Sequence, residues 1–355
     1  MTNYLLAGGG TAGHVNPLLA LADTIKSHSA LHNVYALGTA EGLEKDLVPA
    51  RGYELLTIAR LPFPRRLSVY ALKFPSAWRK AVQTCEQILR DKKIDVVVGF
   101  GGYASAPAYI AAKKLGIPVV VHEANALPGW ANKLGARFAS AVGVAFQNTP
   151  LKGAEFVGMP LREEIEALTG GADKQAARKH FGLDPDTVTL LVTGGSLGAK
   201  KINDAVEASR TVLSAAGIQV LHIVGGRSEL PEISQKDFVR LTYCDRMDLA
   251  IAASDFAISR AGASTVSEFA AVGLPAAFVP YPVGNGEQKL NVADVVKAGG
   301  GLLVLDADFT PNYIAETLVP LLSNNKELTR MANAAKEAGV ADGSLRLFAM
   351  VQGVL

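Results

Sequence analysis

Cysteine is scarce in this chain of 355 residues, which contains two of them, Cys85 and Cys244. Two cysteines so far apart form neither a disulfide framework nor the paired spacing of a zinc or redox site. The simplest interpretation makes both of them small buried hydrophobic residues. No cluster of His and Cys has the spacing of metal ligands, so the sequence predicts no metal site. We expect a reducing, cytoplasmic compartment.

Long hydrophobic runs are also missing. The longest uncharged segments, 96–112 and 269–286, are each interrupted by several Gly or Pro residues, so neither is expected to span a membrane. No basic and apolar leader precedes the first apolar segment, and we therefore expect no signal peptide. The formal net charge of +2 gives no indication of a nucleic-acid partner.

Apolar residues and glycine are abundant, with 49% hydrophobic residues and 35 glycines. The length favours about two domains. Short β-branched segments alternate with helical ones, which indicates a parallel sheet covered by helices on both faces. In the first half the predicted strands are 3–7, 33–37, 53–59, 95–100, 118–123 and 140–146, and the helices between them include 17–28, 76–91 and 105–115.

The alternation stops at 147–162, a segment with two Pro and two Gly that we interpret as a linker. It resumes with a strand, a glycine turn and a helix in 187–206, as at the N-terminus. The later strands are expected at 219–226, 238–244, 255–262, 275–282 and 300–305. We expect an α/β protein whose two parallel-sheet domains face each other across a cleft, since ligands bind beyond the carboxyl ends of such strands.

Glycine loops follow the first strand of each half, GGGTAGH at 8–14 and TGGSLGAK at 193–200. The backbone N–H groups of such a loop and the dipole of the following helix favour an anion. Tight strand–helix packing is the alternative explanation. Neither loop has the P-loop ending or the complete dinucleotide fingerprint, although Glu41 leaves a dinucleotide enzyme as an alternative.

Polar side chains gather at other predicted strand ends. His122, Glu123 and Asn125 follow one strand, and Gln288 lies after another. Amides and carboxylates at that edge suit a ligand rich in hydroxyl groups, such as a sugar. Glu268 lies near the start of a helix, where a carboxylate either binds the hydroxyls of a ribose or only complements the helix dipole. His122 could equally be a core residue.

The segment 58–80 combines basic and large apolar side chains, and no acidic residue occurs between Leu55 and Cys85. This mixture suits the surface of an anionic membrane, although half of the apolar residues could belong to the core. The residues expected to contact the membrane are Arg65, Arg66, Leu72, Lys73, Phe74 and Trp78.

Six motifs occur in an order that resembles the MurG family of bacterial peptidoglycan N-acetylglucosaminyltransferases. They are GGGTAGHVNP, HEANALPGWANK, GMPLR, TGGSLGAKKIN, SRAGASTVSEFAAVGLPAAFVPYP and EQKLNVADVV, and together they extend over essentially the whole chain. The resemblance implies a GT-B fold, with an N-terminal acceptor and membrane-associated domain at 1–158 and a UDP-GlcNAc-binding domain at 159–340. It also implies that the final helix, about 341–355, packs back on the N-terminal domain.

The activity implied by the resemblance is transfer of GlcNAc from UDP-GlcNAc to the C4 hydroxyl of MurNAc in lipid I. The product is lipid II, with inversion at the anomeric carbon and without a metal or other cofactor. The family works at the cytoplasmic face of the cell membrane as a peripheral protein. Its implied partners are the donor, the lipid acceptor, the anionic membrane surface and other proteins of cell-wall synthesis, and no nucleic acid.

The family's motifs also assign residues of this chain to the donor UDP-GlcNAc. The contacts implied are Thr11, Ala12, Gly13, Asn125, Arg162, Ser196, Ala263, Glu268 and Gln288. Ala12 stands where many members have glycine, and Glu287 where a second Gln is common, which puts one sugar contact in doubt.

His14 is the candidate general base for the acceptor hydroxyl, because the ordinary pKa of histidine, about 6.5, lies near working pH. Contact with the diphosphate or sugar, or a packing role in the loop, are the alternatives, and His122 and Glu123 are the reserve candidates for the base. At the level of the whole chain, a UDP-sugar 2-epimerase, another GT-B glycolipid glycosyltransferase and a non-catalytic nucleotide-sugar binder remain as alternatives.

Overall fold

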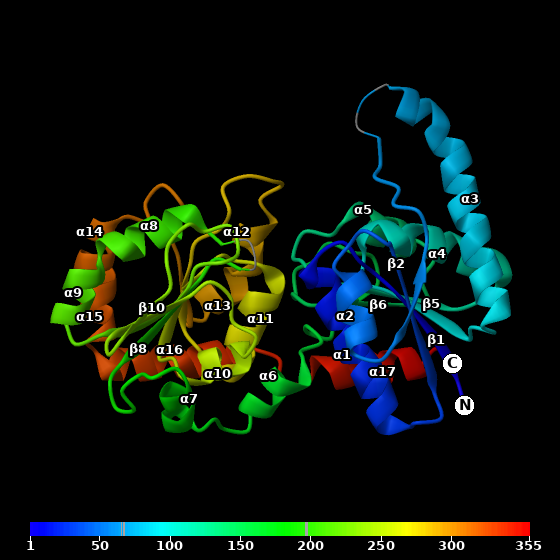
Figure 1. Ribbon diagram of the computed structural model, residues 1–355. Helices are drawn as coiled ribbons and strands as arrows, with labels where there is room; N and C mark the ends of the chain where they lie inside the picture. Colours follow the sequence, from blue (N-terminus) through cyan, green and yellow to red (C-terminus); the bar gives the residue numbers. More distant parts are fainter. Residues whose placement is uncertain (65, 67, 196–197) are drawn as a thin grey trace. The chain divides into compact units, whose positions relative to one another are not determined.

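The computed structural model describes residues 1–64, 66, 68–195 and 198–355 (Figure 1). The chain divides into two compact units. Unit 1 comprises Met1–Arg162 with Asp342–Leu355, and unit 2 comprises Glu163–Ala341. The division at Arg162 lies within the segment that the sequence predicts to be a linker. Each unit contains a seven-stranded sheet, and the predicted α/β class is confirmed.

The sheet of unit 1 has the order β3-β2-β1-β4-β5-β6-β7, with every neighbouring pair parallel. The order in which successive strands are added to the sheet reverses between β1 and β4. Ligands of such sheets bind at this switch point. The strands are β1 (Asn3–Ala7), β2 (Asn33–Gly38), β3 (Glu54–Thr57), β4 (Val96–Gly99), β5 (Val119–Glu123), β6 (Ala141–Val144) and β7 (Ala154–Phe156). The helices are α1 (Ala12–His28), α2 (Glu44–Ala50), α3 (Val69–Asp91), α4 (Gly102–Leu115), α5 (Trp130–Gly135) and α17 (Gly343–Gln352).

Apolar side chains on both faces of β1 explain why helices cover both sides of this sheet. Leu5 and Ala7 pack with residues of α3 and α4, whereas Tyr4 and Leu6 pack with α1 and α17. Because successive side chains of a strand point to opposite faces, a continuous apolar strand needs a helical layer on each side.

The C-terminal helix α17 belongs to unit 1, where Leu347 and Val351 lie in the same core as α1. The first residue of α17, Gly343, packs directly against the backbone of Met159. A Cβ on Gly343 would lie 2.3 Å from the carbonyl oxygen of Met159. The Ser344 hydroxyl donates to the Leu161 carbonyl at 3.2 Å. The last helix is thereby fixed to the segment that ends unit 1.

The sheet of unit 2 has the order β10-β11-β9-β8-β12-β13-β14 and reverses its growth between β8 and β12. The edge pair β10–β11 is antiparallel and the other pairs are parallel. The strands are β8 (Thr189–Thr193), β9 (Gln219–Ile223), β10 (Ile233–Gln235), β11 (Phe238–Leu241), β12 (Phe256–Ser259), β13 (Ala276–Phe278) and β14 (Gly301–Leu303). The helical segments are α6 (Glu163–Leu168), α7 (Lys174–His180), α8 (Lys200–Ala208), α9 (Arg210–Ala215), α10 (Met247–Ala252), α11 (Ala263–Val272), α12 (Glu287–Asn291), α13 (Ala293–Lys297), α14 (Pro311–Tyr313), the π-helix η1 (Ile314–Leu318), α15 (Val319–Leu322) and α16 (Asn325–Ala338).

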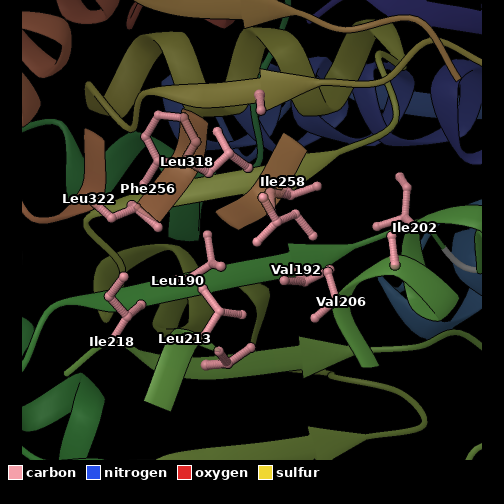
Figure 2. Close-up of a cluster of buried hydrophobic side chains, with 14 of the residues drawn as sticks. Leu190, Val192, Ile202, Val206, Leu213, Ile218, Phe256, Ile258, Leu318 and Leu322 are labelled. Carbon is pink, nitrogen blue, oxygen red and sulfur yellow. The ribbon is translucent and has the colours of Figure 1, made fainter. Parts of the chain in front are cut away.

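Figure 2 shows the main core of unit 2. Leu190 and Val192 on β8 lie among Ile202 of α8, Leu213 of α9 and Leu318 of η1, all fully or almost fully buried. This core holds the two central strands, and therefore the loops that follow them, in fixed positions.

Three helices begin earlier than the sequence predicts. They are α1, which starts at Ala12 and not near Asn16 or Pro17, α3, which starts at Val69, and α4, which starts at Gly102. Each contains a proline about two turns in, namely Pro17, Pro75 and Pro107. Proline is favoured in the first turn of a helix, but helices held by packing tolerate these three prolines further inside. As a consequence, His14 lies in the first turn of α1 and not in the loop before it.

Candidate functional site

Two glycine loops meet at the carboxyl ends of β1 and β4 in unit 1. Gly8–Gly10 follow β1, and Gly101 and Gly102, with φ of +90° and +79°, follow β4. A Cβ on Gly102 would lie 2.6 Å from the carbonyl oxygen of Gly9. Only glycine allows this backbone-to-backbone approach, so the two loops form one rigid edge at the point where the sheet reverses.

His14 is half-buried at this edge. Its Nδ1 lies 3.0 Å from the Gly9 carbonyl oxygen and 3.3 Å from Thr11 Oγ1. Because a carbonyl oxygen can only accept a hydrogen bond, Nδ1 carries a proton and Nε2 of the neutral ring keeps its lone pair. A Cβ on Gly101 would lie 3.3 Å from Nε2, so the nitrogen that can accept a proton faces the loop after β4.

The segment Phe100–Tyr103, which joins β4 to the first residues of α4, lies beside this edge and was not predicted from the sequence. The signal was present, since the buried strand VVVG is followed by FGGY. Tyr103 is exposed, and the guanidinium of Arg60 lies 5.3 Å from the centre of its ring.

The donor residues predicted at the start of α1 lie beside His14. Thr11 is exposed and precedes the helix in an extended conformation, while Ala12 and Gly13 are half-buried in its first turn. Their backbone N–H groups lie at the N-terminus of a 17-residue helix, where an anion is stabilised.

His122 and Glu123, the reserve candidates for the base, have structural roles. His122 is fully buried, donates from Nε2 to the Gly158 carbonyl at 2.9 Å, and has its pKa lowered to about 4 by burial. Glu123 is also buried and accepts from the N–H groups of Asn125 and Gly129 and from Asn132 Nδ2, at 2.9–3.0 Å. For His122 these contacts favour the core role that the sequence left open, and for Glu123 they favour a structural role over that of a reserve base.

The network around Glu123 orders the loop that carries the predicted sugar contact Asn125, which is half-buried. Asn132 connects this loop to α4, since it accepts from the Tyr109 hydroxyl at 2.8 Å and donates to the His122 carbonyl at 3.0 Å. Its Nδ2 would be 3.4 Å from a Cβ on Gly101. The loop after β5 thus lies beside the loop that faces His14.

One of the two predicted diphosphate contacts lies at a unit boundary, and the other is not among the described residues. Arg162, half-buried, is the last residue of the first segment of unit 1. Ser196 lies outside the described residues. The flanking glycines are described: a Cβ on Gly194 would lie 2.3 Å from the Ala199 nitrogen, and one on Gly198 would lie 2.2 Å from the Val224 carbonyl oxygen.

Ala263, Glu268 and Gln288 all belong to unit 2. Ala263 begins α11 at the carboxyl end of β12, and Glu268 lies in the same helix with 9% of its surface exposed. Asn291, the last residue of α12, donates to the Ala261 carbonyl at 3.2 Å, which joins the end of α12 to this strand end. Gln288 is half-buried, and its side-chain oxygen accepts from the Tyr281 N–H at 2.9 Å, so its amide nitrogen is the group that would donate to a ligand.

An aromatic cluster surrounds the N-terminal half of α3, which extends away from the rest of unit 1 in Figure 1. We call it the α3 aromatic surface; it consists of Phe63, Tyr70, Phe74, Trp78 and Trp130, whose successive ring centres lie 5.1–6.2 Å apart. The side chains of Phe63, Tyr70 and Trp130 are exposed, whereas Phe74 and Trp78 are half-buried at the edge of the core.

Exposed cations and the exposed aliphatic side chains of Val69 and Leu72 lie in the same stretch of the chain as the α3 aromatic surface. Leu72 is 82% exposed, and Arg66 and Lys73 are exposed as well. Arg65 lies outside the described residues. The described part of the segment therefore combines aromatic, aliphatic and basic groups on the surface, and a minority of its apolar residues, such as Leu61, is buried.

Two kinds of feature are absent from the described part of the chain. No group of three or more His, Cys, Asp or Glu side chains there is arranged to hold a metal ion. No helix in the described part of the chain combines the length and apolar character needed to cross a membrane. Cys85 and Cys244 are buried and unpaired, as predicted.

Comparisons with known proteins identify the family. Residues 4–144 match the glycosyltransferase family 28 N-terminal domain, and residues 189–347 match the family 28 C-terminal domain. A curated relative from Leifsonia xyli subsp. xyli is 56% identical over 99% of this chain and 98% of its own length. Its name is UDP-N-acetylglucosamine--N-acetylmuramyl-(pentapeptide) pyrophosphoryl-undecaprenol N-acetylglucosamine transferase.

Two solved structures resemble the chain over its length. The crystal structure of MurG from Acinetobacter baumannii is 27% identical, with a TM-score of 0.76, and the match covers 99% of this chain and 100% of that one. A UDP-GlcNAc 2-epimerase from Neisseria meningitidis has the same fold, with 14% identity, a TM-score of 0.69 and coverage of 99% and 100%. The chain therefore belongs to glycosyltransferase family 28 and, within it, to the MurG group of N-acetylglucosamine transferases.

Proposed function

We propose that this chain transfers GlcNAc from UDP-GlcNAc to the C4 hydroxyl of MurNAc in lipid I, forming lipid II and UDP. The observation that carries the proposal is the 56% identity, over 99% of the chain, to a relative named for this reaction. An epimerase shares the fold at 14% identity, which is too low to indicate a shared reaction.

In the proposed reaction His14 is the general base. The C4 hydroxyl oxygen attacks the anomeric carbon of GlcNAc while its proton passes to Nε2 of His14, and the bond from the anomeric carbon to the diphosphate breaks. Attack on the face opposite the leaving UDP inverts the anomeric carbon. The hydrogen bond from Nδ1 to the Gly9 carbonyl supports this role, because it leaves Nε2 as the acceptor and stabilises the imidazolium that forms.

The donor contacts are proposed from the residues that the family's motifs assign. Glu268 would accept from the ribose hydroxyls, and the backbone at Ala263 and the Gln288 amide would contact the sugar. Asn125 would contact the sugar as well. Arg162, Ser196 and the N–H groups at Thr11, Ala12 and Gly13 would stabilise the diphosphate, whose negative charge grows as the bond breaks.

We also propose that the protein acts as a peripheral protein at the cytoplasmic face of the cell membrane. The α3 aromatic surface supports this, because exposed rings and Leu72 favour the lipid interface, while Arg66 and Lys73 attract anionic headgroups. The acceptor's lipid chain requires such a location, since its reactive sugar is attached to a membrane anchor.

The test is to incubate the protein with UDP-GlcNAc and a short-chain lipid I analogue, and to measure UDP release with and without the acceptor. The transferase releases UDP only with the acceptor, in step with disaccharide formation. Conversion of UDP-GlcNAc without the acceptor would indicate an epimerase. Tight donor binding with no turnover would indicate a non-catalytic binder, and turnover only with a different glycolipid would indicate another glycosyltransferase.

A further inference from the structure

Glu44 is a buried carboxylate beside the first glycine loop that the proposed reaction leaves without a role. It begins α2, and 1% of its surface is exposed. Its Oε2 accepts from the Gly10 N–H at 2.8 Å, and its Oε1 accepts from the N–H and the hydroxyl of Thr39, both at 2.8 Å. Both oxygens are therefore occupied by donors from the loops after β1 and β2.

Three glycines enclose this carboxylate. A Cβ would lie 2.4 Å from Oε1 if added to Gly9, 2.1 Å from Oε2 if added to Gly42, and 2.5 Å from Cγ if added to Gly38. No side chain fits at these positions without displacing Glu44. The loops after β1 and β2 are thus closed around one carboxylate. Gly9 of the first loop is therefore needed to make room for Glu44, in addition to any contact with a ligand.

The environment keeps Glu44 ionised. Burial raises the pKa of its carboxyl, but the hydrogen bonds from Gly10, from its own N–H and from Thr39 outweigh burial, and the pKa lies below its ordinary value. An ionised acceptor makes stronger hydrogen bonds than a neutral one. Its hold on the Gly10 N–H therefore persists at neutral pH.

The same peptide group joins Glu44 to His14. The peptide bond between Gly9 and Gly10 contributes the N–H that Glu44 accepts and the carbonyl that accepts from His14 Nδ1 at 3.0 Å. A peptide group is planar and, here, trans, so the direction of its N–H fixes the direction of its carbonyl. Between two glycines, one of them with φ of +88°, this plane would otherwise rotate at little cost.

We propose that Glu44 is a positioning residue for the general base: by holding the Gly9–Gly10 peptide plane, it fixes His14 with the proton on Nδ1 and the lone pair on Nε2. The inference rests on the role given to His14 under the proposed function. Glu44 touches neither substrate nor reacting atoms and acts only through this peptide.

The test is Glu44→Gln in the full-length chain. The amide replaces one accepting oxygen by a donor, so either Gly10 or Thr39 loses its partner whichever way the amide is oriented. We expect kcat to fall by roughly 10- to 100-fold, the scale of a small misplacement of a reacting group, while KM for UDP-GlcNAc changes little. Asp46→Asn, the same chemical change on an exposed residue of α2, is the matched control and should leave kcat unchanged.

A second readout needs no substrate. The ¹⁵N shifts of the His14 imidazole should report the Nδ1–H tautomer in the wild type and in Asp46→Asn. In Glu44→Gln they should move toward the Nε2–H tautomer that predominates for histidine in water. A merely structural role of Glu44 would lower the thermal stability without moving this tautomer.

The outcomes separate the inference from the proposed function. Unchanged kcat together with an unchanged tautomer in Glu44→Gln would overturn the inference, as would a fall in kcat with an unchanged tautomer. If the wild type does not transfer GlcNAc, the proposed function fails, and the ¹⁵N shifts alone still decide the positioning claim. If Glu44→Gln does not fold, Glu44→Asp, which keeps the charge but is too short to reach both loops, is judged by the same two readouts.

Discussion

At the scale of single residues, the geometry of His14 predicts a separation of catalysis from binding. We expect His14→Ala and His14→Gln to lower turnover with the lipid I analogue by about 10²- to 10⁴-fold, the usual effect of losing a general base. UDP-GlcNAc affinity should stay nearly unchanged, and the acidic limb of the pH–rate profile should flatten.

The control for His14 is His28→Gln, an exposed histidine at the other end of α1, which should turn over normally. Donor affinity is measured by calorimetry and turnover by UDP release. If donor affinity falls in step with the rate, His14 is a ligand contact, and the base lies elsewhere.

Glu268 leads to the opposite expectation, a loss of binding. Because a carboxylate that accepts from ribose hydroxyls contributes about 1.5–3 kcal/mol, Glu268→Ala should weaken UDP binding by roughly 10- to 150-fold. Titration calorimetry with UDP alone measures this. Glu337→Ala, an exposed glutamate of α16 in the same unit, should bind UDP like the wild type. Equal UDP affinities for the two variants would mean that Glu268 does not contact the donor and has only a structural role in α11.

The residues of the site differ in how far sequence could predict them. His14 follows a glycine loop in the sequence, so its position beside that loop is a local property. Glu44 is 34 residues from Gly10, and its contact depends on how the loops after β1 and β2 close. For His122 the sequence predicts the position at a strand end correctly. The direction of its side chain depends on a distant group, the Gly158 carbonyl, which it contacts in the core.

At the scale of elements, the membrane proposal predicts a charge effect confined to the start of α3 and the residues just before it. Replacing Arg66 and Lys73 by Ala should weaken binding to anionic vesicles by about 2 kcal/mol, or roughly 30-fold, at about 1 kcal/mol for each cation. Turnover of a short-chain, soluble acceptor should barely change, because neither residue lies at the edge that carries His14.

Liposome flotation with anionic and with neutral vesicles measures the effect. Arg90→Ala with Lys113→Ala removes the same charge from exposed positions on α3 and α4, beyond the α3 aromatic surface, and is the matched control. Equal flotation of the two double variants would mean that the charge near the aromatic surface has no special role.

The elements also show what alternation of apolar and helical segments can and cannot predict. The six apolar strands expected in unit 1 are present because each is continuous and flanked by helical residues. The short strands β7 and β10 were missed because their residues form no buried apolar run, unlike those of the equally short β13. Pairing with β6 and β11 determines them. The helices α1, α3 and α4 begin earlier than predicted, and packing holds them in helical form around Pro17, Pro75 and Pro107.

At the scale of the whole molecule, each unit contains one histidine that is fully buried in its sheet, His122 on β5 and His222 on β9. Burial lowers the pKa of His122 to about 4 and, with a smaller contribution from the charge of Arg240, lowers that of His222 to about 3. In the unfolded chain both rings have the ordinary value of about 6.5.

These pKa values predict acid sensitivity in a defined window. Between pH 6.5 and the folded pKa, the unfolded chain binds a proton that the folded chain does not, so the free energy of unfolding decreases as the pH falls. Each histidine should contribute a loss of about 2 kcal/mol between pH 7.5 and pH 5, at about 1.4 kcal/mol for each pH unit below 6.5. Most carboxylates titrate below this window and contribute little to it.

Both tryptophans, Trp78 and Trp130, lie in unit 1, so their fluorescence in a urea titration follows the unit that contains His122. His122→Asn can still donate to a carbonyl but cannot gain a proton. It should be less stable than the wild type at pH 7.5, and the difference should shrink by about 2 kcal/mol at pH 5, because only the wild type loses the histidine contribution. His222→Asn, in unit 2, should leave the pH dependence of the tryptophan transition unchanged. A difference between wild type and His122→Asn that stays constant from pH 7.5 to pH 5 would show that His122 does not titrate on unfolding.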